Sequence, residues 1–293
     1  FDAYLLSISK NKDIDWLIPT DCTIPNMYPE NIFFIKTNLE SLFNKINILL
    51  NTKIPLNTRK ICDLKPIYGH IFKDHIKGYV FWGCADLDII WGRINKFIDD
   101  NILDNYDIIS SRKNAISGHF TLFRNIEQVN FLFKKIPDYK KYLNKNEFQW
   151  FDEFHFNNFI KDQLKNSLTD LKIYWPKNLL NVERNIDSHQ EYHLDRWLWK
   201  NGKVISSKNN QEIMYLHFIN WKSTIKKNEI SYNSNAKSFI ISYNSIHNKK
   251  NKKYRIIINS FKNIFWGYWV KESRRIFYLK IIQNYKKLSL MKK

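Results

Sequence analysis

Apolar residues recur along the first 220 positions in two spacings, one typical of helices and one typical of strands. A spacing of about 3.6 residues predicts an amphipathic helix over residues 39–49. Short apolar runs that end at glycine, proline or polar turn residues predict strands. The predicted strands cover residues 15–20, 31–36, 78–85, 107–111, 118–124, 171–175 and 213–218, and the predicted helices cover residues 1–9, 39–49, 60–72 with a break near Pro66, 94–97, 126–135 and 148–160. Alternating strands and helices predict an α/β fold built on one mostly parallel sheet flanked by helices.

One apolar stretch, between Gly78 and Gly92, contains two acidic residues. Its first part predicts a central buried strand that ends at Asp86 and Asp88. Buried carboxylates are unfavourable unless a partner replaces their lost hydration, and their oxygen atoms suit Mg²⁺ or Mn²⁺. Ligands of open α/β sheets bind beyond the carboxyl ends of strands, which is where these two residues are expected. The alternative is that both aspartates only form a turn.

Composition limits the class of protein. The chain has 293 residues, of which 44% are hydrophobic and 16% aromatic, and this excludes a disordered chain. No apolar run reaches the roughly 20 residues that span a bilayer, and we expect no signal peptide. Three cysteines without metal-site spacing favour a reduced, cytoplasmic compartment.

Positive charge is concentrated near the C-terminus. The formal net charge is +19, and residues 249–293 hold fourteen Lys or Arg residues against one acidic residue, Glu272. We expect this helical, aromatic-rich segment to lie on an anionic membrane surface. Nucleic-acid binding by charge and stacking, or simple packing on the core, are the alternatives. The predicted division is therefore a catalytic domain over residues 1–220 and a basic extension over residues 221–293.

Several sequence blocks occur in a characteristic order. They are residues 15–21 (DWLIPTD), 60–69 (KICDLKPIYG), 78–88 (GYVFWGCADLD), 106–112 (YDIISSR), 117–125 (SGHFTLFRN), 151–153 (FDE) and 215–218 (YLHF). In this ordered set the chain resembles bacterial polysaccharide glycosyltransferases of the capsule and lipopolysaccharide type, which have a GT-A fold and an Asp-x-Asp motif. The resemblance implies one further strand before the helix over residues 1–9, at the floor of the nucleotide pocket.

The resemblance also implies a metal centre and a base. Asp88 is expected to bind the metal directly, Asp86 to face the ribose or the water shell of the metal, and His217 to complete the site. The alternative for His217 is a hydrogen-bonded core residue. For an inverting reaction Asp152 is the expected general base and Glu153 its substitute, because neighbouring carboxylates on a helix point in different directions. An acidic first turn of a helix is the alternative for this pair.

Other polar residues of these blocks are expected to contact the nucleotide sugar. Cations near a diphosphate favour its binding and departure. A glycine after a loop permits close approach of a ligand. The expected contacts are Asp63, Lys65, Asp86, Arg112, Arg124, Ser117, Gly118 and His119. Solvated surface charge, or a turn that enters a strand, is the alternative for these residues.

Together these features predict a metal-dependent glycosyltransferase that uses Mn²⁺ or Mg²⁺. It would move a hexose such as galactofuranose or galactose from a UDP-sugar to a surface polysaccharide or lipid-linked glycan, in the cytoplasm or peripherally on the inner face of the cytoplasmic membrane. The alternatives are a nucleic-acid-binding basic protein, although no nucleic-acid motif is visible, and a metal-dependent nucleotidyltransferase.

Overall fold

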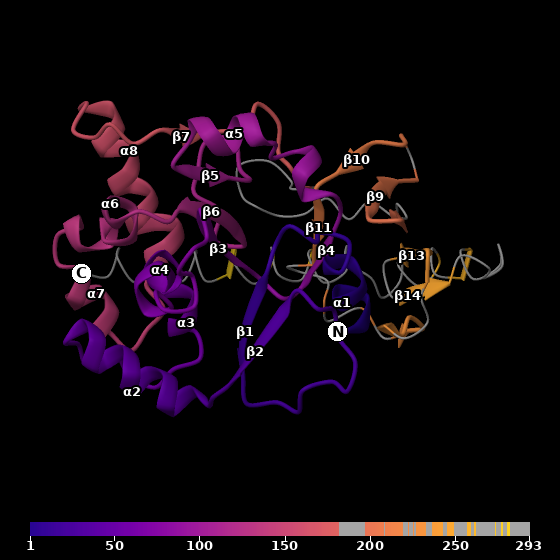
Figure 1. Cartoon of the computed structure of the whole chain (residues 1–293), viewed down its shortest axis with the longest axis horizontal. Helices are drawn as coiled ribbons and strands as arrows, with labels where there is room; N and C mark the ends of the chain where they lie inside the picture. The colour runs from indigo at the N-terminus through magenta and orange to yellow at the C-terminus, as the bar shows by residue number, and fades with distance from the viewer. Residues whose placement is uncertain are drawn as a thin grey trace. The chain divides into compact units, whose positions relative to one another are not determined.

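The computed structural model describes most of the chain (Figure 1). The described residues are 1–181, 197–207, 209–218, 222, 225, 227–232, 236–242, 245–248, 257, 258, 261, 273, 277, 280 and 281. They form two compact units. The first, here the helical unit, contains Asn11–Leu87 and Ile94–Asn181. The second, here the sheet unit, contains Phe1–Lys10, Asp88–Arg93 and the described residues from 197 onward.

The helical unit contains two separate sheets. Its strands are β1 (Trp16–Thr20), β2 (Ile32–Lys36), β3 (Phe81–Ala85), β5 (Ile108–Ser110), β6 (Phe120–Arg124) and β7 (Ile173–Tyr174). β1 and β2 form a parallel pair and lie side by side in Figure 1. The other four strands form one sheet in the order β3-β6-β5-β7. In it β6 is antiparallel to both β3 and β5, whereas β5 and β7 are parallel.

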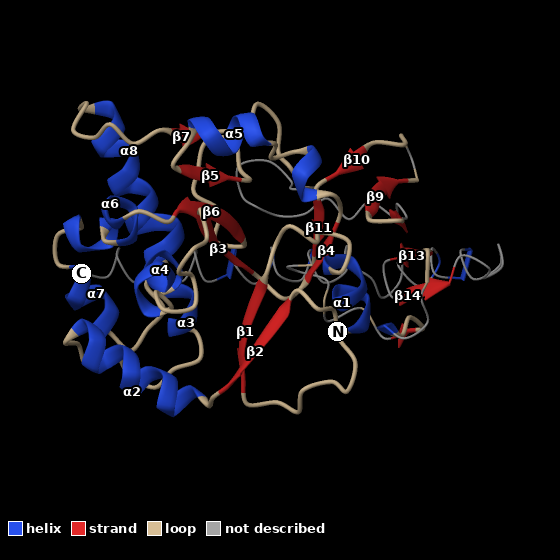
Figure 2. Cartoon of the chain, in the orientation of Figure 1, coloured by secondary structure: helices blue, strands red, loops and turns tan. Residues whose placement is uncertain are grey.

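Helices make up much of the rest of the helical unit, as the blue segments of Figure 2 show. They are α2 (Leu39–Leu50), α3 (Lys60–Asp63), η1 (Lys65–Ile67), α4 (Tyr68–Ile71), η2 (Ile94–Lys96), α5 (Asp100–Asn105), α6 (Glu127–Asn130), η3 (Leu132–Lys135), α7 (Tyr139–Asn144), η4 (Phe151–Phe156) and α8 (Asn157–Lys165). The predicted break near Pro66 is confirmed, because the 3₁₀ turn η1 separates α3 from α4. Buried side chains of the helices pack with those of the four-stranded sheet in one apolar core that includes Phe43, Phe123 and Phe156.

The sheet unit contains helix α1 and the remaining strands of the described chain. They are α1 (Asp2–Ile8), β4 (Ile89–Trp91), β8 (Trp197–Lys200), β9 (Lys203–Ser206), β10 (Glu212–Ile213), β11 (Tyr215–His217), β12 (Lys227–Asn228), β13 (Ser238–Ser242) and β14 (Ser245–Asn248). Six strands form a sheet in the order β10-β9-β8-β13-β14-β12, and β11 pairs with β4. Its core includes Trp199, whose ring stacks on that of Phe239 at a centroid distance of 4.8 Å.

The mixed α/β class is confirmed, but the sheet arrangement differs from the expected one. The described strands form four sheets, and seven of their ten strand pairings are antiparallel. The expected central strand, β3, lies at the edge of its sheet and pairs with β6 in antiparallel register. Pairing direction depends on partners that are distant in sequence, and the apolar pattern of a single strand does not encode it.

The expected boundary at residue 220 stays a prediction. In the sheet unit, β8 pairs with β13, so one sheet contains strands from both sides of that position. Most of the basic segment 249–293 lies outside the described residues. Among the described residues, no helix combines the length and apolar character that a membrane span requires.

Candidate functional site

The two aspartates of the apolar stretch lie where the chain leaves one unit and enters the other. β3 ends at Ala85 and β4 begins at Ile89, so the stretch forms two strands in different sheets. The backbone of Asp86 is held in the helical unit, where its N–H donates to the carbonyl oxygen of His119 at 3.1 Å. The backbone of Asp88 is held in the sheet unit, where its carbonyl oxygen accepts from Phe218 N–H at 2.7 Å.

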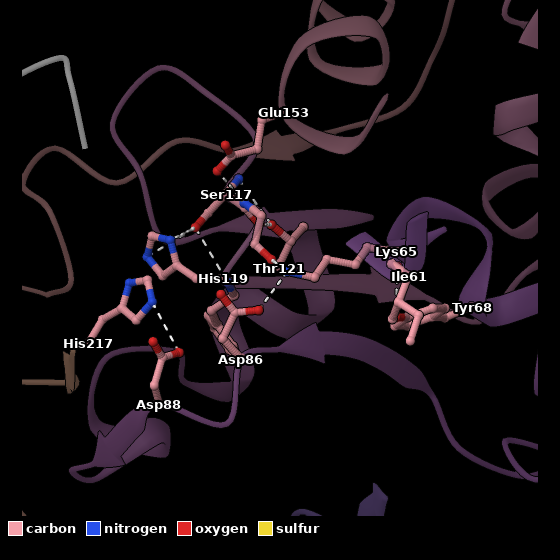
Figure 3. A network of polar contacts seen from close by, with 12 residues as sticks. Ile61, Lys65, Tyr68, Asp86, Asp88, Ser117, His119, Thr121, Glu153 and His217 are labelled. Carbon is pink, nitrogen blue, oxygen red and sulfur yellow. Dashed lines mark hydrogen bonds and ion pairs between the residues drawn. The ribbon is translucent and has the colours of Figure 1, made fainter. Parts of the chain in front are cut away.

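In the sheet unit, the two carboxylate oxygens of Asp88 each contact a nitrogen atom of another side chain. His217 Nε2 lies 3.5 Å from Asp88 Oδ1, and the dashed line in Figure 3 marks this contact. Lys222 Nζ lies 2.9 Å from Asp88 Oδ2. Burial by itself raises the pKa of Asp88, but the hydrogen bonds and charges of His217 and Lys222 outweigh it and hold the pKa well below its ordinary value. Asp88 is therefore ionised at neutral pH, which is the form that binds a metal.

In the sheet unit, the carboxylate of Asp88 and the imidazole of His217 form a pair that could hold a metal ion. Asp86, the expected third ligand, is two positions before Asp88 in the chain. Carboxylate oxygens together with an imidazole nitrogen suit Mn²⁺, whereas Mg²⁺ prefers oxygen ligands alone. The donor set therefore fits the expected divalent metal, with Mn²⁺ as the better match. The pairing of β11 with β4 explains how His217 reaches this position, because it places His217 opposite Ile89, directly after Asp88.

Lys65 links two parts of the helical unit. Its Nζ lies 2.6 Å from Asp86 Oδ1 and donates to the carbonyl oxygen of Gly118 at 2.5 Å (Figure 3). Burial of Lys65 favours its neutral form, but the charge and hydrogen bond of Asp86, together with the charges of Cys84 and Asp152, outweigh that effect and raise the pKa of Lys65 above its usual value. The lysine therefore stays protonated and provides a fixed positive charge beside Asp86.

Asp152 and Glu153 both approach Gly118. Glu153 Oε1 accepts from Gly118 N–H at 3.1 Å. A Cβ atom at residue 118 would lie 2.8 Å from Asp152 Oδ2 and 2.8 Å from Glu153 Oε1, so any other residue there would displace these two carboxylates. The expectation that neighbouring carboxylates point apart does not hold here. The residues belong to η4, a π-helical turn, and not to the expected α-helix.

Asp152 is the more unusual of the two carboxylates. It is 4% exposed, and its Oδ1 has no hydrogen-bond partner among the residues that the structure describes. Burial, together with the nearby charges of Glu153 and Asp63, outweighs the opposing charge of Lys65 and raises the pKa of Asp152 to about 7. A carboxyl group with a pKa near 7 exchanges its proton readily at neutral pH, as a general base requires.

Ser117 and His119 lie at the turn that precedes β6. Ser117 Oγ lies 3.1 Å and 3.2 Å from the two ring nitrogens of His119, and Asn181 Nδ2 lies 3.0 Å from His119 Nε2. Thr121 closes the turn, because its hydroxyl donates to Ser117 O at 2.7 Å. Ser117 and His119 are buried and contact each other, His119 also contacts Asn181, and their expected contact with the nucleotide sugar stays a prediction.

The remaining predicted residues make their described contacts with other groups. Asp63 is completely buried and pairs with Lys60. Arg124 is at the opposite end of β6 from Gly118, where it pairs with Asp107 at 3.0 Å. Arg112 follows β5, and its backbone N–H donates to Ser110 Oγ at 3.1 Å.

The sequence interpretation missed Lys222. This lysine is five positions after His217 and contacts the other oxygen of Asp88. Only the pairing of β11 with β4 brings these positions together. The one available signal was the proximity of a cation to His217 in sequence.

Comparisons with known proteins identify the family of the chain. Residues 1–250 match the family of unknown function DUF6625. No curated protein and no solved structure matches the chain. The match covers most of the chain, and the chain therefore belongs to the DUF6625 family.

Proposed function

We propose that the chain is a metal-dependent glycosyltransferase that moves a hexose from a UDP-sugar to a bacterial surface polysaccharide or lipid-linked glycan. The observation that carries this proposal is the pairing of Asp88 with His217 in the sheet unit, two positions after Asp86 in the chain, because a carboxylate and an imidazole suit Mn²⁺. The resemblance of the ordered sequence blocks to polysaccharide glycosyltransferases supplies the reaction class. A GT-A-like arrangement is part of the proposal, and the parallel pair β1–β2 and the position of the aspartates directly after β3 support it.

The metal centre is assigned to Asp88 and His217, with Asp86 as the third ligand. A bound divalent ion would offset the negative charge that develops on the departing diphosphate. Lys65 keeps its positive charge and holds the Asp86 carboxylate in place. Lys222 neutralises Asp88 when no metal is bound.

Asp152 is proposed to accept the proton of the acceptor hydroxyl in an inverting reaction. Its pKa of about 7 and its unpartnered Oδ1 favour it over Glu153, which is engaged by the Gly118 N–H. The charge of Lys65 favours ionised Asp152. Lys65 therefore interacts with both sites of charge change in the proposed reaction: Asp152, which takes up a proton, and the region of Asp86, where the departing diphosphate gains negative charge.

The acceptor is proposed to be a glycan chain, free or linked to lipid. For a lipid-linked acceptor, the basic segment 249–293 would attach the enzyme to an anionic membrane surface. Most of that segment lies outside the described residues, so this part of the proposal depends on composition.

A turnover assay on the full chain tests the proposal. The protein is incubated with Mn²⁺ and a panel of UDP-sugars in the presence of glycan acceptors, and UDP release is measured. UDP release that depends on both metal and acceptor supports the transferase. Pyrophosphate release from a nucleoside triphosphate would identify a nucleotidyltransferase instead, and salt-sensitive oligonucleotide binding without nucleotide-sugar binding would identify a nucleic-acid-binding protein.

A further inference from the structure

Lys60 and Asp63 form an ion pair that is sealed from solvent. Lys60 Nζ lies 2.7 Å from Asp63 Oδ2, and both side chains are 0% exposed. Replacing such a pair by apolar residues of similar size is often neutral or stabilising. Stability alone therefore does not explain why two charges occupy this position, and their contacts suggest a more specific role.

Asp63 binds the backbone of a segment that is distant in sequence. Asp63 Oδ1 accepts from Phe151 N–H at 2.9 Å. Gln149 N lies within 3.2 Å of Oδ1 and 3.1 Å of Oδ2. Lys60 Nζ donates to the carbonyl oxygens of Tyr142 at 3.1 Å and Glu147 at 3.5 Å. The pair thus holds the chain just before η4 by both its donors and its acceptors.

This segment has a demanding conformation. Trp150 is in the left-handed region, with φ of 51°, which non-glycine residues adopt only when their surroundings enforce it. Trp150 also gives η4 no side-chain cap. The first N–H groups of a helix have no partner within the helix. Asp63 provides the acceptor for Phe151, and so replaces the missing cap from a distance.

The two residues that follow Phe151 are the carboxylates that approach Gly118. Their fit is tight, because an added Cβ at residue 118 would be less than 3 Å from both of them. A shift of the turn would move Asp152 relative to Gly118 and Lys65. Misplacement of a reacting group by about 1 Å can lower a rate by about 100-fold.

We infer that Asp63 is a positioning residue that fixes the turn bearing Asp152 and Glu153, with Lys60 as its buried counter-charge. The structural part of this inference stands on the hydrogen bonds of Asp63. The effect on rate rests on the proposed function.

Hydrogen exchange of the full chain tests the structural part without any assay of activity. The amides of Gln149 and Phe151 are expected to exchange slowly in the wild type, and at least tenfold faster in the Asp63→Asn variant. Asn has one acceptor oxygen where Asp has two, so it either presents its NH₂ group to the Lys60 ammonium or turns it toward the two backbone amides, and both arrangements weaken the hold on the segment. Rapid exchange of both amides in the wild type, or unchanged exchange in the variant, would overturn the inference.

Steady-state kinetics tests the functional part, with Lys60→Met as the matched control. This control keeps the carboxylate and its backbone contacts while it removes the counter-charge. Asp63→Asn is expected to lower kcat about 100-fold with KM for the UDP-sugar within twofold, whereas Lys60→Met keeps kcat within about threefold at a lowered Tm. Equal losses of kcat in both variants would reduce the role of Asp63 to stability and overturn the inference. Absence of turnover in the wild type would instead contradict the proposed function and leave the exchange result to decide the positioning role.

Discussion

Two lysine–aspartate pairs of the helical unit have their lysines in one short helical segment, α3 and η1, and the pairs differ in solvent exposure, in partners and in sequence separation. In the first pair, Lys60–Asp63, both side chains are 0% exposed and every identified partner is backbone or the paired charge. In the second pair, Lys65–Asp86, the lysine is 9% and the aspartate 33% exposed. The first pair lies within three residues of sequence, and the second joins positions 21 residues apart.

This difference in exposure indicates a structural role for Lys60–Asp63 and a role in ligand binding for Lys65–Asp86. A buried pair that binds backbone groups fixes a local conformation, because no ligand can reach its atoms. A partly exposed pair beside a candidate metal ligand can interact with a ligand and respond to it. The sequence blocks place Asp63 and Lys65 two positions apart, so a motif alone gives both residues the same role. Burial assigns them different ones.

The largest expected effect is on stability. Asp63→Ala leaves the Lys60 ammonium buried without a counter-charge, so we expect a loss of about 3–5 kcal/mol in the free energy of unfolding. Asp86→Ala removes a side chain that is 33% exposed and leaves Lys65 bonded to the carbonyl oxygen of Gly118, so it is expected to cost less than about 2 kcal/mol. Denaturant unfolding of both variants measures the contrast. Equal losses would contradict the distinction between the buried pair Lys60–Asp63 and the partly exposed pair Lys65–Asp86.

The next effect is on turnover. Lys65→Met removes the charge that holds Asp86 and favours ionised Asp152, so we expect kcat to fall about 100-fold. Lys60→Met serves as the control, because it removes a buried lysine of the same segment without touching Asp86. Steady-state kinetics of the two variants, both checked for folding, measures the ratio. A Lys65→Met enzyme with normal kcat would contradict a role of the Lys65–Asp86 pair in turnover.

A smaller effect concerns pH. The pKa of Asp152 is raised from its usual value near 3.9 to about 7 in the folded state. As a base, Asp152 works when deprotonated, so the rate is expected to rise about tenfold between pH 6 and 8. The folded state binds the proton of Asp152 more tightly than the unfolded state does. The stability contributed by protonated Asp152 is therefore full below about pH 4 and is lost as the pH rises through 7.

The charges around Asp152 sharpen this pH test. Lys65 lowers its pKa, whereas Glu153 and Asp63 raise it. Loss of Lys65 should therefore move the rising limb of the pH–rate profile upward, and Glu153→Gln should move it downward while turnover is retained. A profile that is flat from pH 6 to 8 in the wild type would remove Asp152 as the base.

The smallest effect concerns Lys222. Its side chain is 65% exposed, and exposed ion pairs contribute about 0.2–1 kcal/mol. Lys222→Ala is expected to raise the affinity of Asp88 for Mn²⁺ alone by up to about fivefold, because the metal no longer competes with an ammonium group. Titration of Mn²⁺ in the absence of nucleotide measures this change, and Lys200→Ala, a variant of an exposed lysine elsewhere in the sheet unit, is the control. Weaker Mn²⁺ binding by Lys222→Ala would contradict the competition.

Local patterns predicted local elements well. Residues 39–49 and the interruption near Pro66 follow from spacing and from the missing N–H of proline, and the structure confirms both. The strand that ends before Asp86 was predicted, and β3 confirms it. The short strand β4 was not predicted, because three apolar residues after Asp88 are too few to indicate a strand by their pattern.

For the candidate site, sequence identified residue types better than their surroundings. Asp86, Asp88 and His217 were expected at one metal site because of the resemblance to polysaccharide glycosyltransferases, and in the sheet unit Asp88 and His217 lie 3.5 Å apart. The burial of Asp63 and Lys60 was missed, because charged residues are rarely buried unless they are paired, and their pairing depends on the fold. The shared approach of Asp152 and Glu153 to Gly118 was missed because it depends on a π-helical turn.

Thermal stability in the presence of UDP, with and without Mn²⁺, tests the central claim most directly. A ligand present at 100 times its Kd stabilises the folded state by about 2.7 kcal/mol. We predict that UDP raises the Tm of the wild type only when Mn²⁺ is present, and that a folded Asp88→Ala variant shows no such shift. A UDP-dependent shift that persists in Asp88→Ala, or that needs no metal in the wild type, would contradict the assignment of Asp88 to a metal centre for nucleotide binding.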